Sequence, residues 1–273
     1  MVGSVIEEKG KYALITGGSS GIGKALAEAL ARRGKPVLLV ALASKELEDT
    51  VLFIRQETGV NVYGLGIDLT EPGAALRVLA WTREMNYPVD FLINNAGIGG
   101  AGRFSDLDPL LINNCIALNI KALTDLIHCF LPILSSGGKS WILNVSSMAA
   151  FFDIPYKSLY SATKSYVLSL SRGLRAELAP KGVRVFVLSP NAVLTSQSVI
   201  SRIEIHGKKM RFLQVTAERL AERTLKLIEK DRFLIFQNRL DWFLYLGSRL
   251  LPKRLQSRML CREFSKEVRA KSS

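Results

Sequence analysis

The sequence predicts an α/β fold in which helices cover both faces of a parallel β-sheet. Short, nearly continuous apolar runs alternate along the chain with longer stretches of helical pattern, as expected for strands that are buried on both faces. The 273 residues are 48% hydrophobic, which is enough apolar material for one sizeable core. Because no internal repeat or low-complexity linker interrupts the pattern, we expect one large domain.

Six apolar runs are expected to form strands. Each run is short and rich in aliphatic or aromatic side chains, as buried strands are. The runs are residues 12–16, 37–41, 61–69, 91–93, 141–145 and 183–188. A last strand is expected after Asp231.

The helices between the runs end at residues that commonly stop or cap a helix. Ser44 is expected to cap a helix that begins with acidic residues and ends near Gly59. The helical stretch 160–178 is expected to stop at Pro180 and Gly182.

The charge of the chain is strongly positive, because 37 Lys and Arg residues exceed 24 Asp and Glu residues by 13. Nucleic acid, an anionic membrane surface and a phosphorylated ligand are the acidic partners that this charge suggests. The two histidines and three cysteines have no metal-ligand spacing, so we expect neither a metal site nor a disulfide framework.

The start of the chain does not resemble a secretory signal, because acidic residues precede the first apolar run and no small-residue cleavage site follows. No run reaches the roughly 18 apolar residues of a membrane-spanning helix. We therefore expect a cytoplasmic protein with reduced cysteines, which could lie at the periphery of a membrane.

A glycine-rich turn follows the first expected strand and opens a helix at residues 24–31. Its pattern is T-G-x-x-x-G-x-G, with Gly17, Gly21 and Gly23 at the glycine positions. Glycine permits a tight turn and lets backbone N–H groups approach a pyrophosphate at the positive end of the helix. Any tight turn could require glycine, but the position between a strand and a helix favours a nucleotide site.

Tyr160 and Lys164 lie four residues apart in a helical stretch, so both side chains project from one face. The unperturbed pKa of a tyrosine is about 10, and a nearby ammonium group brings proton transfer within range of neutral pH. Such a pair could protonate a carbonyl oxygen, or accept the proton in the reverse reaction. Tyr/Lys pairs at this spacing are also common on exposed helix surfaces. Other segments of the sequence are therefore needed to distinguish a catalytic pair from a surface pair.

Other segments complete a pattern that resembles the short-chain dehydrogenase/reductase (SDR) family. Ser147 ends a buried strand and precedes Tyr160 by the spacing that separates the serine and tyrosine of this family. Asn119 lies where the family has a helix asparagine, and Asp68 follows the third strand as the family's acidic residue does. Two further matches are N-N-A-G at residues 94–97 and P-N-A-V-L-T at residues 190–195.

The resemblance runs in order and spacing from about residue 11 to residue 195. It implies a Rossmann-like, doubly wound parallel sheet of about seven strands with helices on both faces. It also implies NAD(P)(H)-dependent interconversion of a carbonyl and a secondary alcohol. The sequence looks most like the branch that contains 3-ketoacyl-CoA reductases, 17β-hydroxysteroid dehydrogenases and 3-ketosphinganine reductases. One departure is Asn191, which replaces a glycine, although asparagine tolerates a left-handed backbone better than most residues.

The resemblance implies roles for four catalytic residues. Tyr160 would be the general acid or base, and Ser147 would hold the substrate oxygen beside it. Lys164 would tune Tyr160 and hold the nicotinamide ribose. Asn119 would support Lys164 through an ordered water.

The cofactor is expected to be NADP(H) rather than NAD(H). Residues 40–45 lack the acidic side chain that accepts from a ribose 2′-hydroxyl group, and Ser44 and Lys45 could cradle a 2′-phosphate. The residues expected to contact the cofactor are Gly17, Ser19, Ser20, Gly21, Ile22, Gly23, Asp68, Leu69, Asn95, Ala96, Gly97, Tyr160, Lys164, Pro190, Val193 and Thr195.

The substrate is expected to be a hydrophobic ketone or a 3-oxoacyl lipid. Phe151 and Phe152 lie in the loop that borders the substrate in the family, although both could equally be core residues. Residues 196–214 would form a substrate lid. The alternative function is a non-catalytic NADP-binding or membrane-surface scaffold that has kept the fold.

The sequence changes character after Phe236. We therefore expect a catalytic and cofactor-binding domain at residues 1–236 and a basic amphipathic helical extension at residues 237–273. Residues 231–273 hold ten Lys and Arg residues and four Asp and Glu residues, with aromatic and leucine residues between them. Pro252 is expected to divide the extension into two short helices.

The sequence is compatible with more than one binding partner. The extension could pack on the domain or on a sister subunit, or it could lie on a membrane surface. The resemblance implies a homodimer or homotetramer, formed through the helices that carry Asn119 and Tyr160. No nucleic-acid partner is expected, because no recognition helix or aromatic–basic motif is found.

Overall fold

A computed structural model describes residues 10–136, 138–191 and 215–261 of the chain. Two predicted cofactor contacts, Val193 and Thr195, lie outside the described residues. The expected lid at 196–214 and the last part of the extension, at 262–273, also lie outside them.

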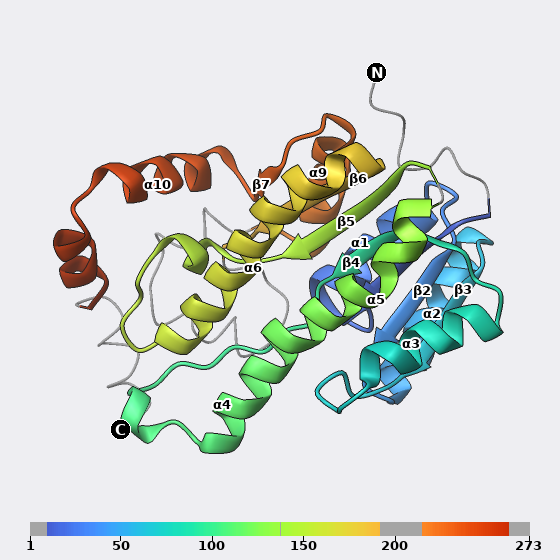
Figure 1. The fold of residues 1–273 in the computed structure, drawn as a ribbon, viewed down its shortest axis with the longest axis horizontal. Helices are drawn as coiled ribbons and strands as arrows, with labels where there is room; N and C mark the ends of the chain where they lie inside the picture. Colours follow the sequence, from blue (N-terminus) through green and yellow to red (C-terminus); the bar gives the residue numbers. More distant parts are fainter. Residues whose placement is uncertain (1–9, 137, 192–214, 262–273) are drawn as a thin grey trace.

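Seven parallel strands form one sheet, as predicted, in the order β3-β2-β1-β4-β5-β6-β7 (Figure 1). The chain runs outward from β1 to β3 and then returns to the other side of β1, so the strand order reverses between β1 and β4. In open sheets of this kind, ligands bind at the carboxyl edge beside such a reversal. The strands are β1 (Tyr12–Thr16), β2 (Val37–Ala41), β3 (Val62–Gly66), β4 (Val89–Asn94), β5 (Ser140–Val145), β6 (Val183–Ser189) and β7 (Leu234–Phe236).

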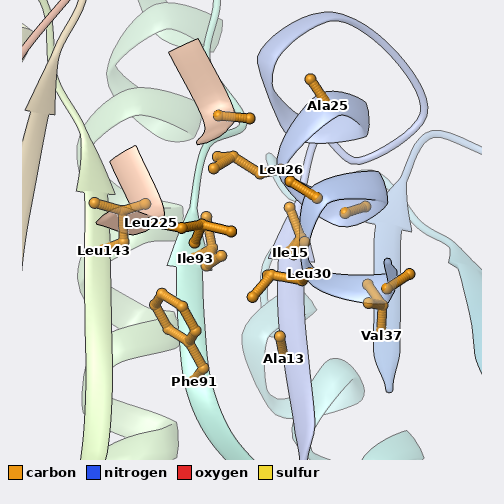
Figure 2. Close-up of a cluster of buried hydrophobic side chains, with 14 of the residues drawn as sticks. Ala13, Ile15, Ala25, Leu26, Leu30, Val37, Phe91, Ile93, Leu143 and Leu225 are labelled. Atoms are coloured by element: carbon orange, nitrogen blue, oxygen red, sulfur yellow. The ribbon is translucent and has the colours of Figure 1, made fainter. Parts of the chain in front are cut away.

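Helices cover both faces of the sheet, and alternate strand residues contribute to two separate cores. The first core includes Ile15, Phe91 and Leu143 from the strands, packed against helix residues such as Leu26 and Leu225 (Figure 2). Its helices are α1 (Gly21–Ala31), α2 (Lys45–Thr58) and α9 (Ala217–Glu229). The helices of the second core are α3 (Ala74–Glu84), α5 (Leu123–Ser136) and α6 (Ser158–Leu178).

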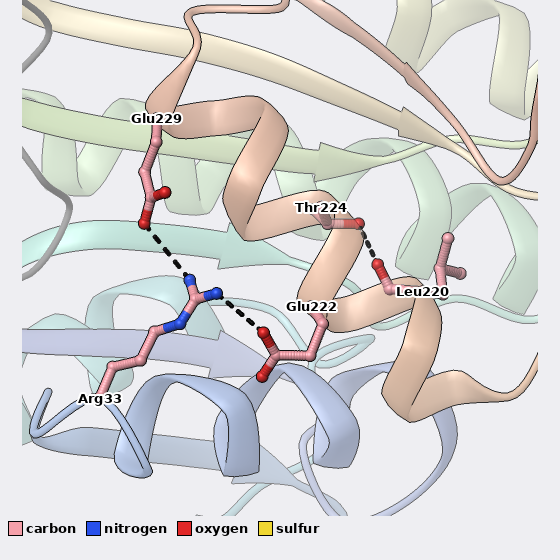
Figure 3. Close-up of polar contacts among 5 residues, drawn as sticks. All are labelled: Arg33, Leu220, Glu222, Thr224 and Glu229. Carbon is pink, nitrogen blue, oxygen red and sulfur yellow. Dashed lines mark hydrogen bonds and ion pairs between the residues drawn. The ribbon is translucent and has the colours of Figure 1, made fainter.

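Helix α9 closes the first face and is joined to the end of α1 by ion pairs. The Arg33 guanidinium lies 2.8 Å from a carboxylate oxygen of Glu222 and 3.4 Å from one of Glu229 (Figure 3). On the buried side of the helix, the Thr224 hydroxyl donates to the Leu220 carbonyl over 2.7 Å, which satisfies a polar group that has no access to water.

A buried ion pair, which the sequence pattern did not reveal, lies toward the amino edge of the sheet. Lys35 Nζ and Asp90 Oδ2 are 2.6 Å apart, with side chains 1% and 2% exposed. Lys35 precedes β2 and Asp90 lies near the start of β4, so the pair joins segments on either side of β1. It lies at the opposite edge of the sheet from the carboxyl ends of the strands.

One helical stretch meets the length and mean hydropathy of a membrane span, although the chain has no unbroken apolar run of that length. The continuous helical stretch Pro109–Ser136 is long and apolar enough to cross a membrane by length and composition, although a third of its most apolar window is buried inside the protein. It contains α4 (Pro109–Ile116), a π-helical turn (Ala117–Ala122) and α5. Single polar residues interrupt the apolar run without lowering its mean hydropathy much, which is why a search for an unbroken run missed it.

The extension forms two helices on either side of Pro252, as predicted: α10 (Arg239–Leu250) and a helical segment at residues 253–261. The Tyr245 ring lies 4.8 Å from that of Phe151 and 5.4 Å from that of Phe236. Figure 1 shows the two helices beyond the carboxyl end of β5. The boundary at residue 236 coincides with the end of β7, and the division into two functional parts stays a prediction.

Candidate active site

The glycine-rich turn brings the start of α1 close to the ends of β1 and β2. Gly17 has a φ of 63°, and its N–H group donates to the Val40 carbonyl over 2.7 Å. Helix α1 begins at Gly21, three residues earlier than predicted, and a Cβ atom on Gly23 would lie 2.2 Å from the Gly17 carbonyl oxygen. Glycine is therefore required at Gly23 by close contact, and at Gly17 by a left-handed backbone.

The N-N-A-G segment at the end of β4 is fastened to this turn. Asn95 Nδ2 donates to the carbonyl oxygens of Thr16 and Gly17 over 2.9 and 3.0 Å. The buried Thr16 hydroxyl oxygen accepts the N–H groups of Asn95 and Ala96, each over 3.0 Å. Two segments that are about 80 residues apart in sequence thus form one rigid shelf at the carboxyl edge.

Asn119 lies in the π-helical turn between α4 and α5 and is 1% exposed. Its amide makes reciprocal hydrogen bonds with the backbone of Ile98: Oδ1 accepts over 2.9 Å and Nδ2 donates over 2.8 Å. The same Nδ2 also donates to the Thr163 hydroxyl oxygen on α6, over 3.1 Å. π-Helical turns are rare and often occur at functional sites, and the sequence pattern did not predict this one.

Lys164 is buried between α6 and the end of β5. Its Nζ donates to the Val145 carbonyl over 2.9 Å, and the residue is 5% exposed. Burial lowers the pKa of Lys164 to about 8, because removing the ammonium group from water penalises its charged form. A Cβ atom on Gly97 would lie 3.0 Å from Asn119 Oδ1 and 3.2 Å from Lys164 Nζ, so glycine leaves room for both.

Tyr160 lies close to Lys164 on α6, and Ser147 follows the end of β5, whose last carbonyl accepts from Lys164. Lys164 Nζ is 5.9 Å from the centroid of the Tyr160 ring, one helical turn away on α6. The Ser147 oxygen accepts the N–H group of Ala149 over 3.1 Å and lies 3.5 Å from the Pro190 carbonyl. The preceding hydroxyl, on Ser146, donates to the Lys164 carbonyl over 2.8 Å and holds the end of β5 against α6.

The other predicted cofactor contacts lie at the same edge of the sheet. The Asp68 carboxylate follows β3 and accepts from the Thr70 N–H and hydroxyl groups over 2.8 and 2.7 Å, which lowers the pKa of Asp68. Leu69 is buried beside it. Ser19 and Ser20 precede α1, and Ile22 packs against the first core from the first turn of that helix.

Ser44 and Lys45 are already engaged at the start of α2. The Ser44 hydroxyl oxygen accepts the Leu47 N–H over 3.3 Å, which confirms the predicted N-cap. Lys45 Nζ lies 2.7 Å from Asp49 Oδ2, but both side chains are more than half exposed, so this ion pair contributes little to stability. Replacing this ion pair by one between Lys45 and a cofactor phosphate would therefore cost little free energy.

Two positions beside the site have partners on the C-terminal extension. Phe151 is half-buried in a cluster with Phe236 and Tyr245, which favours the packing interpretation of this residue. Asn191 Nδ2 donates to Asp241 Oδ1 over 3.1 Å. No sequence pattern connects Asn191 with Asp241; the one signal was that Asn191 departs from the glycine of the family pattern.

A family model described as short chain dehydrogenase matches residues 11–203. An uncharacterized oxidoreductase of Staphylococcus saprophyticus is 32% identical over 194 residues, which cover 71% of this chain and 83% of that protein. A very-long-chain 3-oxoacyl-CoA reductase of Anas platyrhynchos is 34% identical over 198 residues, which cover 71% of this chain. The match spans only 63% of that reductase.

Solved structures are similar over nearly the whole chain. A short-chain dehydrogenase of Sphingobium yanoikuyae in complex with NADPH is 33% identical, with a TM-score of 0.75 over 88% of this chain and 93% of that chain. A bulky-bulky ketone specific alcohol dehydrogenase of Comamonas testosteroni is 30% identical, with a TM-score of 0.74 over 88% of this chain and 92% of that chain.

We expect Gly23→Ala to destabilise the protein, because its Cβ atom would also lie 2.5 Å from Asn95 Nδ2 and would push the shelf apart. The expected loss is about 1–3 kcal/mol in the free energy of unfolding, measured by denaturant titration. The matched control is Gly173→Ala, at an exposed helical position with nothing within 4 Å of the new atom, which should be neutral or slightly stabilising. Equal effects of the two substitutions would contradict this account of Gly23.

Proposed function

Because the chain belongs to the short-chain dehydrogenase family, we propose that it interconverts a carbonyl and a secondary alcohol by hydride transfer with NADP(H). The observation that supports this most strongly is the convergence of Tyr160, Lys164, Ser147 and Asn119 at the carboxyl edge of the sheet. A protein that only binds a dinucleotide has no need of a proton donor beside a buried ammonium group. Catalysis is therefore favoured over a non-catalytic scaffold.

In the proposed reaction, the bound cofactor supplies or accepts a hydride at the substrate carbon. Tyr160 donates the proton to the substrate oxygen during reduction and accepts it during oxidation. Ser147 holds that oxygen beside the Tyr160 hydroxyl. The Lys164 ammonium lowers the cost of the Tyr160 phenolate and binds the cofactor ribose, while Asn119 keeps the neighbouring backbone and α6 in place.

The glycine-rich turn and the shelf behind it fit a dinucleotide. Helix α1 begins at Gly21, directly after the turn, and the N–H groups of a first helical turn are suited to bind a pyrophosphate. We propose that NADPH binds more tightly than NADH, because residues 40–45 offer Ser44 and Lys45 and no carboxylate. The NADPH complex of the similar Sphingobium yanoikuyae protein is in keeping with this preference.

We propose a bulky hydrophobic ketone or a 3-oxoacyl lipid as the substrate. The names of similar proteins, an oxoacyl-CoA reductase and an alcohol dehydrogenase specific for bulky ketones, support this class. In this chain, the apolar residues Phe152, Ile154 and Pro155 follow Ser147 in the substrate-side loop. Reduction is the proposed direction, since NADPH is the proposed cofactor.

We propose a homodimer or homotetramer that buries the outer face of the stretch Pro109–Ser136. Only a third of the most apolar window in this stretch is buried in the single chain. Ile116 is 42% exposed there, and Tyr166 of α6 is 37% exposed beside it, within 3.0 Å of the Thr124 hydroxyl. Helix α5 packs against the sheet, so only its outer side is open to a partner. A second copy of the chain could cover that side, whereas a membrane span would have to be surrounded by lipid.

We propose that the two helices of the extension contact an anionic membrane surface. Their apolar side chains are largely exposed: Leu240, Trp242, Phe243, Leu244, Leu250, Leu251, Leu255 and Met259 are each at least 42% exposed. Basic side chains lie among them, and the only acidic residue of 239–261 is the buried Asp241. An apolar face with cations is complementary to anionic lipid.

We expect Tyr160→Phe to abolish reduction and to leave the binding of NADPH intact, because only the proton donor is removed. Turnover is followed by NADPH absorbance against steroid, acyl and sphingoid ketones, and binding by fluorescence titration with NADPH and NADH. Full activity of this variant would exclude Tyr160 as the proton donor. Tight NADPH binding by the unmodified protein, without oxidation of NADPH by any ketone, would favour the scaffold alternative.

We expect kcat/KM for NADPH to fall as the pH rises through about 8, the value to which burial lowers the pKa of Lys164. Below this pH the ammonium group is present, and above it the neutral amine neither binds the ribose as strongly nor favours the Tyr160 phenolate. Because kcat/KM reports ionisations of the free enzyme, initial rates between about pH 6 and about pH 10 test this directly. A constant value across this range would contradict the assigned role of Lys164.

We expect the protein to sediment with vesicles that contain phosphatidylglycerol and less with vesicles of phosphatidylcholine alone. A double substitution, Phe243→Ser with Leu250→Ser, should reduce sedimentation, because it removes apolar side chains that are 59% and 84% exposed. The matched control is Leu76→Ser with Phe104→Ser, at side chains that are each 61% exposed elsewhere. Identical sedimentation of both variants would argue against contact through the extension.

A further inference from the structure

The hydrogen bond between Asn191 and Asp241 links the active site to α10. Asn191 follows the end of β6 and stands where the family pattern has glycine, so this contact depends on a side chain that the pattern lacks. Asp241 lies in the first turn of α10 and is 1% exposed. Helix α10 therefore presents a buried carboxyl group to the segment that follows β6.

Asp241 also has a local role, which does not explain its burial. The Asp241 N–H group donates to Asn238 Oδ1 over 2.9 Å, so Asn238 caps α10. Burial raises the pKa of Asp241, and hydrogen bonds from Asn191 and from the Asn238 backbone oppose this, as does the charge of Arg223 on α9. A carboxylate that only supports a helix end is better placed in water, where it keeps its hydration.

From Asn191 the contact leads directly to Ser147. The Pro190 carbonyl, next to Asn191, accepts the Met148 N–H over 2.9 Å and lies 3.5 Å from the Ser147 hydroxyl oxygen. A second contact from α10 reaches the segment that follows Ser147, because Tyr245 packs on Phe151 in the short helix Met148–Phe151. Helix α10 thus contacts Asn191, next to Pro190, and the short helix after Ser147.

We propose that Asp241 is a positioning residue, which acts through Asn191 to hold Pro190 and Ser147 in place for the reaction. The inference rests on the proposed function, because the placement of Ser147 matters for rate only if this serine holds the substrate oxygen. Active sites require their reacting groups to be held within a fraction of an ångström, and a rigid helix supplies such support better than a loop. The extension is then part of the catalytic apparatus, whatever its outer face contacts.

The first test is Asn191→Asp, which places two carboxyl groups where a donor and an acceptor now meet. At neutral pH the two groups repel each other, and we expect kcat/KM for the ketone to fall on the order of tenfold, because a hydrogen bond to a buried charge contributes on this scale. Acidification should restore part of the loss, since two adjacent carboxyl groups can share one proton. An unchanged pH profile relative to the unmodified protein would overturn the proposal.

The second test exchanges the two side chains. In the double variant N191D/D241N the amide and the carboxylate meet again in reverse, so kcat/KM should return close to that of the unmodified protein. If kcat/KM of the double variant is no higher than that of Asn191→Asp alone, the proposal is overturned. The matched control is Thr216→Ala, which removes the side-chain cap of α9 and leaves the hydrogen bond between Asn191 and Asp241 untouched; it should lower the melting temperature and leave kcat unchanged.

The two tests separate this inference from the proposed function. Turnover by the unmodified protein establishes the reductase activity on its own. If the ketone panel contains no substrate, the proposed function fails. The Kd for NADPH then still decides whether Asp241 and Asn191 act as a pair. It is measured by fluorescence with the same variants at the same pH values. Equal Kd values for Asn191→Asp and the unmodified protein at all pH values would then overturn the inference.

Discussion

The proposed active site is organised around one ammonium group that is removed from water. In the described part of the chain Lys164 has no carboxylate partner, and burial of an unpaired charge costs several kcal/mol. The cost is limited by the Val145 carbonyl, which accepts from Nζ, and by a pKa low enough for the group to release its proton near neutral pH. Val145 is the last residue of β5, so its carbonyl lies at the carboxyl edge of the sheet, where Nζ reaches it.

The elements around Lys164 are arranged so that the ammonium group fits. Gly97 lacks a side chain where Nζ and Asn119 Oδ1 approach, and the π-helical turn places Asn119 between the Ile98 backbone and α6. The Ser146 hydroxyl fixes the other side of α6. Each of these contacts satisfies a buried polar group with a partner from a distant part of the chain, so the site is rigid because its polar groups have few alternative partners.

Helix α10 packs on the domain with one face and leaves its other face exposed. Its inner stripe is narrow: Asp241 and Ser248 are buried, and Tyr245 between them is half-buried. A helix attached by so narrow a stripe leaves most of its circumference uncovered, and here that outer surface carries aromatic, leucine and arginine side chains. Residues 231–273 carry ten Lys and Arg residues against four Asp and Glu residues, nearly half of the excess positive charge of the chain, and a phosphorylated cofactor bound at α1 cannot neutralise it there. Packing on the domain and contact with a lipid surface are therefore compatible, because they use different faces of one helix.

The parallel sheet, the helices on both faces, the glycine-rich turn and the Tyr160–Lys164 pair could be predicted from the amino-acid sequence. These features depend on local periodicity and on spacing within one element, which can be counted along the chain. Contacts between elements became known only from the folded structure: the π-helical turn at Asn119, the buried pair of Lys35 and Asp90, and the hydrogen bond from Asn191 to Asp241. The physical reason is that burial and hydrogen bonding of polar groups depend on neighbours from other parts of the chain. No periodicity in a single sequence specifies those neighbours.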